Sequence, residues 1–274
     1  MNVPAMVLVD GLPVRAVPVL DRGLHYGDGL FETVIVRRGR ARFAALHAAR
    51  LERGRERLGI PPVPPPDFDA LAGVLGSDGV LKLMLTRGDA RARGYGTTDD
   101  ESGRTIVLWY PDSPASGVSS PSCRATWLRY SRWGENPALA GLKHLNRLEQ
   151  VLARRELAQT ADVDEGLVRS SSGDLVSGTQ SNVFIVNGSQ LTTPRIDRCG
   201  IAGVIREVVL REAHRFGLTP SVIAVDPAIV DGRTSLFFTN ARVGVWPVVS
   251  LDGRPLPVPE PVLRLRELVE SLDA

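Results

Sequence analysis

The residue of this chain with the most distinctive chemistry is Lys143. Of the 33 lysines and arginines among the 274 residues, only Lys82 and Lys143 are lysines. An arginine stays protonated near neutral pH, so only a lysine can act as a neutral amine. Lys143 follows the small and apolar residues 138–142, and the next acidic residue is Glu149. Poor solvation disfavours the protonated form of an amine, which suits Lys143 to act as a nucleophile or base and to form a Schiff base.

A surface charge is the ordinary role of a lysine, and for Lys143 that interpretation stays open beside the chemical one. Lys82 lies within residues 80–86, where the pattern alternates and is mostly apolar. Alternation of this kind is typical of a strand with one solvated face. We therefore expect Lys82 to be structural.

Several other positions suit a phosphate group. Arg50 lies in a predicted helix over 43–58, although an arginine on a solvated helix face is the ordinary interpretation. The N–H groups that begin a helix can bind an anion, and so can those of a turn after a strand. The residues of this kind are Val204 and Ile205, near the start of a predicted helix, and Thr239 and Asn240, at the end of a predicted strand. A lysine, an arginine and two backbone turns together are what a pyridoxal phosphate enzyme needs.

The composition excludes several other classes of function. The net charge is +2 and the arginines are scattered, so no basic tract suggests nucleic-acid binding. The four histidines and two cysteines, Cys123 and Cys199, show no metal-binding spacing, so we expect no metal. We expect both cysteines to be reduced, although a disulfide stays open, and the first ten residues lack a signal-peptide pattern. No apolar run is long enough to cross a membrane, so we expect a cytoplasmic protein.

Both halves of the sequence mix strands and helices, which predicts an α/β (α+β) fold of two domains. The predicted strands are 6–9, 14–19, 30–36, 80–86, 105–110, 125–131, 166–170, 175–176, 182–186 and 236–239. The predicted helices are 43–58, 67–76, 143–159, 203–216 and 260–272. The polar, proline-punctuated stretch 113–121 is typical of a linker. We therefore expect a small N-terminal domain over 1–112 and a larger, cofactor-binding domain over 122–274.

Five parts of the sequence resemble a known family. In order, they are Asp21–Thr33, His47–Leu51, Lys143, Ser177–Phe184 and Gly203–Arg206. They look like motifs of the fold-type IV pyridoxal phosphate enzymes, which include branched-chain and D-amino-acid aminotransferases and 4-amino-4-deoxychorismate lyase. Within this family, Asn136–Val151 and Arg93–Tyr95 are most similar to the lyase.

The resemblance implies a role for each matching cofactor-site residue. Lys143 would hold pyridoxal 5'-phosphate as an imine and then transfer protons. Arg50 would bind the phosphate through two N–H groups of its guanidinium. The backbone around four further residues would complete the phosphate site: Val204, Ile205, Thr239 and Asn240.

The resemblance also implies how substrate and subunits are arranged. Arg93, Tyr95 and Arg242 are the candidates for binding a substrate with two carboxylates. The family is further expected to form homodimers and to hold the cofactor in the cleft between the two domains.

Ser177 departs from the family pattern. The family normally has a glutamate five residues before Asn182, where it hydrogen-bonds the pyridine nitrogen. A serine would leave the ring a weaker electron sink, which favours elimination over transamination. A shifted alignment or a weakly active paralogue would explain the same difference. Phe31 stands where the D-amino-acid enzymes have a carboxylate-binding tyrosine, so D-specificity is not expected.

The resemblance therefore implies a pyridoxal phosphate-dependent carbon–oxygen lyase. It would convert 4-amino-4-deoxychorismate to 4-aminobenzoate and pyruvate, a step of folate biosynthesis. The alternative is a branched-chain or related amino-acid aminotransferase of the same fold. A non-catalytic binding protein that kept the fold is the third interpretation.

Overall fold

The computed structural model describes residues 3–64, 66–75, 78–98, 100–111 and 121–272. Contacts between residues divide the chain into two compact units, which are described one at a time. Of the described residues, 3–111 and 142–146 belong to the first unit, and 121–141 and 147–272 belong to the second. Lys143 thus belongs to the first unit. The predicted domain limits stay a prediction, and the predicted linker, apart from Pro121, lies outside the described residues.

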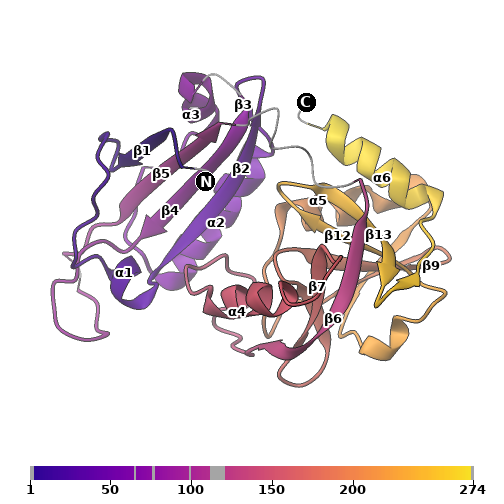
Figure 1. The fold of residues 1–274 in the computed structure, drawn as a ribbon. Helices are drawn as coiled ribbons and strands as arrows, with labels where there is room; N and C mark the ends of the chain where they lie inside the picture. Colours follow the sequence, from indigo (N-terminus) through magenta and orange to yellow (C-terminus); the bar gives the residue numbers. More distant parts are fainter. Residues whose placement is uncertain (1–2, 65, 76–77, 99, 112–120, 273–274) are drawn as a thin grey trace. The chain divides into compact units, whose positions relative to one another are not determined.

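The first unit is built on an antiparallel sheet (Figure 1). Its described strands lie in the order β1-β5-β4-β2-β3. They are β1 (Met6–Val9), β2 (Gly29–Arg37), β3 (Arg40–Ala41), β4 (Gly79–Thr86) and β5 (Arg104–Pro111). The helices are α1 (Arg22–Tyr26), α2 (Ala44–Leu58), which packs on β2, and α3 (Phe68–Leu75).

The two faces of this sheet differ along β2 and β4. On the buried face, a Cβ on Gly54 of α2 would lie 2.8 Å from the side chain of Leu30, so the glycine allows close packing of helix on sheet. The opposite face carries four half-buried side chains in two cross-strand pairs, Phe31 with Met84 and Thr33 with Lys82. Because successive side chains of a strand point to opposite faces, these four side chains lie on the face that α2 does not cover.

The second unit is built on a larger, mixed sheet. Its described strands lie in the order β11-β10-β9-β12-β13-β6-β7-β8, with β14 beside β13. They are β6 (Cys123–Trp133), β7 (Glu165–Ser170), β8 (Leu175–Gly178), β9 (Asn182–Asn187), β10 (Gln190–Pro194), β11 (Thr219–Ile223), β12 (Ser235–Asn240), β13 (Gly244–Leu251) and β14 (Arg254–Pro255). The helices are α4 (Leu148–Leu157), α5 (Val204–Glu212) and α6 (Glu260–Ser271), with short 3-10 turns at Ala213–Phe216 and Pro227–Ile229.

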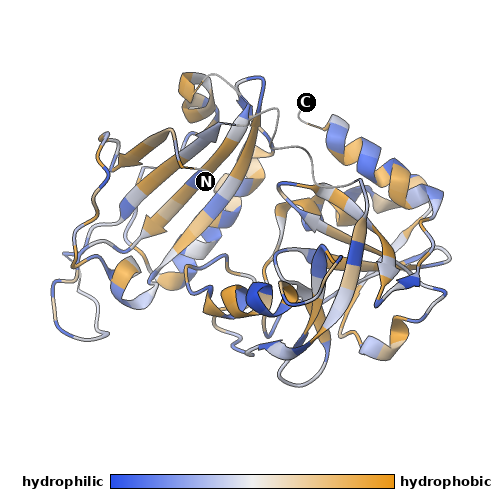
Figure 2. Cartoon of the chain, in the orientation of Figure 1, coloured by the Kyte–Doolittle hydropathy of each residue, from blue (hydrophilic) through white to orange (hydrophobic). Residues whose placement is uncertain are grey.

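The core of the second unit lies against this sheet. The rings of Phe184 and Phe237 are fully buried and stack with their centroids 4.8 Å apart. Helix α6 packs on β13 and buries Val262, Leu265 and Val269. This spacing gives the helix one hydrophobic side and one hydrophilic side, as its alternating colours show (Figure 2).

The predicted α/β fold and most predicted elements are confirmed, but the strand over 14–19 is wrong. These residues are exposed and belong to no strand. Pro13 and Pro18 flank or interrupt the stretch, and a proline offers no N–H group to a sheet. The short helix α1 and the strands β3, β10, β11, β13 and β14 were not predicted.

The helix predicted to begin at Lys143 begins instead at Leu148. The residues before it pair along the edge of β2, with Leu145 N–H donating to the Gly29 carbonyl at 2.9 Å. Tertiary pairing therefore overrides the helical spacing of the apolar residues. None of the described helices is long and apolar enough to span a membrane.

Candidate active site

Lys143 lies beside Phe31 in the first unit. The N–H of Phe31 donates to the carbonyl of Lys143 at 2.9 Å, and Leu30 and His144 form an antiparallel bridge. This pairing makes the two side chains neighbours, and Nζ of Lys143 lies 3.8 Å from the centroid of the Phe31 ring. The half-buried amine is thus held by its backbone and packs on an aromatic face, which attracts the charged form of an amine.

Lys82, the other lysine, approaches the same ring. Its Nζ lies 5.5 Å from the centroid of Phe31, and its cross-strand neighbour is Thr33. Burial lowers the pKa of Lys82 below its usual value. The strand pattern favoured a structural role for Lys82, but the structure brings both lysines of the chain to one phenyl ring. The only hint of this placement in the sequence was that lysine is so rare in it.

Arg50 of α2 forms a buried ion pair with Glu32 of β2. Nε of Arg50 donates to Oε1 of Glu32 at 2.8 Å and Nη2 donates to Oε2 at 2.5 Å, while Nδ1 of His47 lies 2.7 Å from Oε2. The Nε edge of the guanidinium therefore binds a carboxylate. Phosphate binding by Arg50 stays a prediction, and it would have to use other N–H groups of the same side chain.

Charge interactions and hydrogen bonds within this cluster stabilise the ionised form of Glu32. Burial would raise the pKa of Glu32, but the charge of Arg50 and the hydrogen bonds from His47 and Arg50 outweigh it and lower the pKa to about 2. Burial also lowers the pKa of His47, although its hydrogen bond to Glu32 opposes this change. At neutral pH the histidine is therefore uncharged and Glu32 is ionised.

The three predicted substrate-binding residues are exposed and belong to different units. Arg93 and Tyr95 lie on a loop of the first unit, where Tyr95 is 84% exposed and the centroid of its ring lies 5.2 Å from that of Tyr26. Arg242 follows β12 in the second unit. Their contact with substrate stays a prediction.

In the second unit, the start of α5 and the end of β12 together suit an anion. The N–H groups of Val204 and Ile205 begin α5 and so have no acceptor within the helix. No side chain of the described residues caps the helix at Gly203. A Cβ on Gly203 would collide with Oδ1 of Asn182, which is the cross-strand neighbour of Thr239. Oγ1 of Thr239 is buried and has no hydrogen-bond partner among the residues that the structure describes. A buried hydroxyl of this kind is costly unless a ligand satisfies it.

Asn240 shapes the turn that follows β12. Its Oδ1 accepts hydrogen bonds from the N–H groups of Arg242 at 2.9 Å and Val243 at 3.0 Å. Its Nδ2 donates to the carbonyl of Gln180 at 3.4 Å. The side chain is therefore engaged in holding the turn, and the cofactor-binding role of Asn240 stays a prediction.

Ser177 of β8 is paired with Trp133 of β6. The indole Nε1 donates to Oγ of Ser177 at 2.7 Å, and Oγ donates to the carbonyl of Gly178 at 2.8 Å. The hydroxyl is buried and uses its single proton within the unit. The sequence pointed to Ser177 but not to Trp133, because nothing in the local pattern links positions 44 residues apart.

Glu165 is a second buried group that the sequence did not indicate. It is fully buried, and its carboxylate accepts hydrogen bonds from the N–H of Thr179 at 2.9 Å, from the Thr179 hydroxyl, and from Oγ of Ser181 at 2.9 Å. These bonds hold the turn between β8 and β9. Glu165 therefore fixes the approach to Asn182.

Metal chemistry finds no support in the described residues. No group of three or more His, Cys, Asp or Glu side chains in these ranges is arranged to hold a metal ion. Cys123 and Cys199 are both free, as expected. Burial raises the pKa of both thiols, that of Cys199 to about 11, so neither is a ready nucleophile.

Comparison with known proteins identifies the family. The profile described as amino-transferase class IV matches residues 29–251. The chain belongs to the class IV aminotransferase family. Members of this family are pyridoxal phosphate enzymes, and pyridoxal 5'-phosphate is the cofactor of this chain. The unpartnered hydroxyl of Thr239 and the uncapped start of α5 fit the phosphate group of that cofactor.

Similar members of the family include lyases and aminotransferases. The crystal structure of 4-amino-4-deoxychorismate lyase from Pseudomonas aeruginosa has a TM-score of 0.88 and 39% identity, covering 98% of this chain and 100% of that one. Aminodeoxychorismate lyase of Vibrio harveyi is 29% identical over 97% of this chain and 98% of its own length. D-Alanine aminotransferase of Bacillus licheniformis is 26% identical over 88% of this chain and 85% of its own length.

Proposed function

We propose that this chain is an aminodeoxychorismate lyase, which converts 4-amino-4-deoxychorismate to 4-aminobenzoate and pyruvate in folate biosynthesis. The observation that carries the proposal is the 39% identity with the Pseudomonas aeruginosa lyase along nearly the whole chain. The placement of Lys143 and Lys82 supports it, since the reaction needs an amine that transfers a proton and cations for two carboxylates.

Lys143 is the proposed catalytic residue. Bound pyridoxal phosphate supplies an electron-withdrawing ring for the substrate's amino group. Nζ of Lys143 takes the proton from the ring carbon that bears this amine. The carbon–oxygen bond to the side chain then breaks, enolpyruvate leaves and gains a proton to become pyruvate, and the six-membered ring becomes aromatic. Aromatisation supplies driving force, so the step needs less electron withdrawal than transamination does.

The phosphate of the cofactor is proposed to bind in the second unit. The N–H groups of Val204 and Ile205 would donate to it at the start of α5, and Thr239 would supply the hydroxyl that otherwise has no partner. Asn240 would contribute through the turn that its side chain holds. Phosphate binding by Arg50 stays a prediction from the sequence, and Glu32 fixes the orientation of its guanidinium.

The substrate carboxylates are proposed to bind cationic and hydrogen-bonding groups. Lys82 is a candidate because its half-buried ammonium approaches the same ring as Lys143. Arg93, Tyr95 and Arg242 remain candidates from the sequence. A carboxylate next to a partly desolvated lysine gains more from its charge than one in open water.

Ser177 supports elimination over transamination. In the proposed site its hydroxyl would face the pyridine nitrogen, where a glutamate would keep the nitrogen protonated. The Trp133 indole donates to Ser177, and the serine proton goes to the Gly178 carbonyl. Because its single proton is already used, Ser177 would not donate to the ring nitrogen, and it has no negative charge to keep that nitrogen protonated. The weaker electron withdrawal would suit a reaction driven by aromatisation.

Two incubations separate the lyase from its alternative. The alternative is a branched-chain or related amino-acid aminotransferase, which is favoured by the wider family. A lyase forms 4-aminobenzoate from enzymatically generated aminodeoxychorismate and converts the bound cofactor to its pyridoxamine form only slowly with L-leucine, L-valine or L-glutamate. Efficient conversion by an L-amino acid without 4-aminobenzoate formation would contradict the proposal. A purified protein that does not bind the cofactor would favour a non-catalytic role.

We also propose a cytoplasmic homodimer. Each unit leaves apolar side chains uncovered within a single chain. In the first unit these include Leu12, Val19, Leu20 and Leu24, and in the second Tyr130, Leu148, Val151 and Leu152. Exposed apolar side chains that adjoin one another mark interfaces, and we propose that a partner subunit covers some of these residues. Sedimentation equilibrium at micromolar concentration is expected to give twice the chain mass, and a monomer would contradict the proposal.

A further inference from the structure

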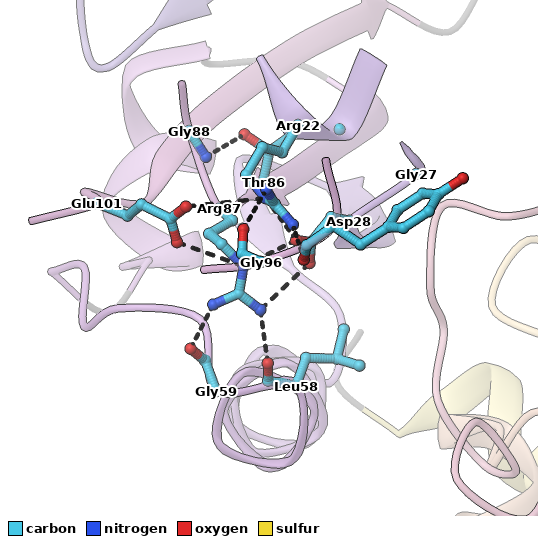
Figure 3. Close-up of polar contacts among 12 residues, drawn as sticks. Arg22, Gly27, Asp28, Leu58, Gly59, Thr86, Arg87, Gly88, Gly96 and Glu101 are labelled. Atoms are coloured by element: carbon cyan, nitrogen blue, oxygen red, sulfur yellow. Dashed lines mark hydrogen bonds and ion pairs between the residues drawn. The ribbon is translucent and has the colours of Figure 1, made fainter. Parts of the chain in front are cut away.

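A buried cluster of two arginines and two carboxylates lies in the first unit, where β2 begins and β4 ends (Figure 3). Nε of Arg22 lies 3.0 Å and Nε of Arg87 lies 2.7 Å from Oδ2 of Asp28. The carboxylate of Glu101 lies 3.9 Å from Nε of Arg22 and 3.8 Å from Nε of Arg87, and its side chain is only 1% exposed. The two positive and two negative charges balance, so each arginine is held in place by acids on the same unit.

The two arginines use their remaining N–H groups differently. Arg87 donates to the two carbonyls at the end of α2, at 2.7 and 2.6 Å. Arg22 donates instead to the carbonyls of Tyr95 at 3.1 Å and Gly96 at 2.9 Å. One arginine thus joins the cluster to a helix, and the other joins it to the loop that carries Arg93 and Tyr95.

Side-chain packing extends the contact between Arg22 and this loop. The guanidinium carbon of Arg22 lies 5.0 Å from the centroid of the Tyr26 ring, and that ring lies 5.2 Å from the ring of Tyr95. Tyr95 itself is 84% exposed, so burial contributes little to fixing the loop. The two hydrogen bonds from a charged donor therefore have a large share in ordering it.

We propose that Arg22 is a positioning residue that orders Arg93–Gly96 for substrate binding. The proposal rests on the proposed function, in which Arg93 and Tyr95 bind carboxylates of the substrate. Asp28 holds the guanidinium of Arg22 through a hydrogen bond, and Glu101 attracts it through charge at 3.9 Å. The guanidinium in turn binds two consecutive carbonyls, which set the backbone from which Arg93 and Tyr95 project. Loosening the loop raises the entropy that substrate binding must overcome and so weakens binding without changing the chemical step.

Arg87 provides a matched control. Like Arg22, it lies next to Asp28 and Glu101, but its remaining N–H groups bind the end of α2 and not the loop at Tyr95. The variants R22K and R87K both keep the charge and both lose the planar fork that reaches two carbonyls. In the holoenzyme, R22K is expected to raise KM for aminodeoxychorismate about tenfold and to leave kcat within about twofold. R87K is expected to leave KM within about twofold of the wild-type value. It should nevertheless lower the melting temperature about as much as R22K does.

Two further measurements separate positioning from general stability. Amide hydrogen exchange of the substrate-free holoenzyme is expected to rise at residues 93–96 in R22K but not in R87K. In an R93A background, R22K is expected to raise KM much less than in the wild type, because residues that act through one another are not additive.

Equal KM values for R22K and R87K, unchanged exchange at residues 93–96 in R22K, or a fall in kcat alone would each overturn the inference. These outcomes require an active wild-type lyase. A wild type without lyase activity would overturn the proposed function instead, and the exchange experiment would still report whether Arg22 orders the loop.

Discussion

Lys143 and Lys82 share one aromatic partner, with their Nζ atoms 3.8 and 5.5 Å from the centroid of the Phe31 ring. No other lysine exists in the chain. Both amines are therefore placed on the same face of the first unit's sheet, and only one of them is proposed to hold the cofactor. This division of roles can be tested directly.

Borohydride reduction should fix the cofactor to Lys143. After reduction and digestion, the peptide containing Lys143 is expected to carry the added mass of the reduced cofactor in wild type and in K82M, and no peptide should carry it in K143A. K82M is the matched control, because it removes the only other lysine and keeps an unbranched side chain of similar length. Modification at Lys82 in K143A would contradict the assignment.

Replacing Lys82 should weaken the binding of the substrate rather than that of the cofactor. If its ammonium binds a substrate carboxylate, K82M is expected to raise KM about tenfold or more while the dissociation constant of the cofactor stays within about twofold. K82R keeps the charge and should recover part of the loss. Steady-state kinetics and spectroscopic titration measure the two quantities. An equal loss of cofactor affinity would show a role different from the one proposed.

Replacing Thr239 with valine should separate cofactor binding from stability. The isosteric change removes a buried hydroxyl that has no partner in the unit, so the melting temperature of the cofactor-free protein should stay the same or rise. The dissociation constant of pyridoxal phosphate should rise about tenfold.

T193V is the control for this change. The hydroxyl of Thr193 donates to the carbonyl of Val183 at 2.8 Å, so its loss should cost about 1 kcal/mol of stability and leave cofactor affinity unchanged. A destabilised T239V protein with normal cofactor affinity would contradict the phosphate role.

The ion pair between Glu32 and Arg50 should make stability depend on pH below the usual range of a glutamate. The folded pKa of Glu32 is about 2, against 4.5 for the unperturbed group. A lowered carboxylate pKa stabilises the fold above pH 4.5, and this contribution, about 3 kcal/mol, is lost as the pH falls through 4.5 towards 2. The difference in free energy of unfolding between wild type and E32Q should shrink over this interval.

E52Q serves as the control on the exposed side of α2. Glu52 pairs with Arg55 at the surface, where such pairs contribute little to stability. Urea denaturation at several pH values should therefore show a small effect for E52Q throughout. A difference between wild type and E32Q that does not vary from pH 7 to pH 2 would rule out the linkage.

Ser177 can be tested without relying on turnover. In S177E a carboxylate replaces the hydroxyl, so the ¹⁵N chemical shift of ring-labelled cofactor should move to that of a protonated pyridine, and the rate of conversion by L-amino acids should rise at least about tenfold. S177A removes the hydroxyl without adding a charge, so it should leave the ring nitrogen unprotonated. A protonated ring nitrogen in the wild type would contradict the interpretation of Ser177.

Much of the fold could be predicted from the sequence, because many of its helices and strands are determined by the pattern of their own residues. The alternating strand β4 and the amphipathic helices α2 and α5 are encoded by their own residues. The helix predicted from Lys143 failed for the opposite reason. Its first residues pair with Gly29 and Phe31, more than a hundred positions away, and that pairing competes with helix formation.

The candidate site shows the same limit. The sequence points to Lys143 through its rarity and context. The structural role predicted for Lys82 stays a prediction, because an alternating strand does not reveal which of its faces has a function. Trp133 and Ser177 are joined only by folding, as are Arg22 and the loop at Tyr95. Partners that lie far apart in sequence require the three-dimensional structure.

The reaction proposed for this chain is the elimination of pyruvate from aminodeoxychorismate. The most direct measurement quantifies 4-aminobenzoate and pyruvate together after the purified protein, loaded with pyridoxal phosphate, acts on a known amount of this substrate. We expect equal amounts of both products, no requirement for an oxo-acid acceptor, and loss of both products in K143A. Formation of neither product by the loaded wild type, or a reaction that proceeds only when an oxo acid is added, would contradict it.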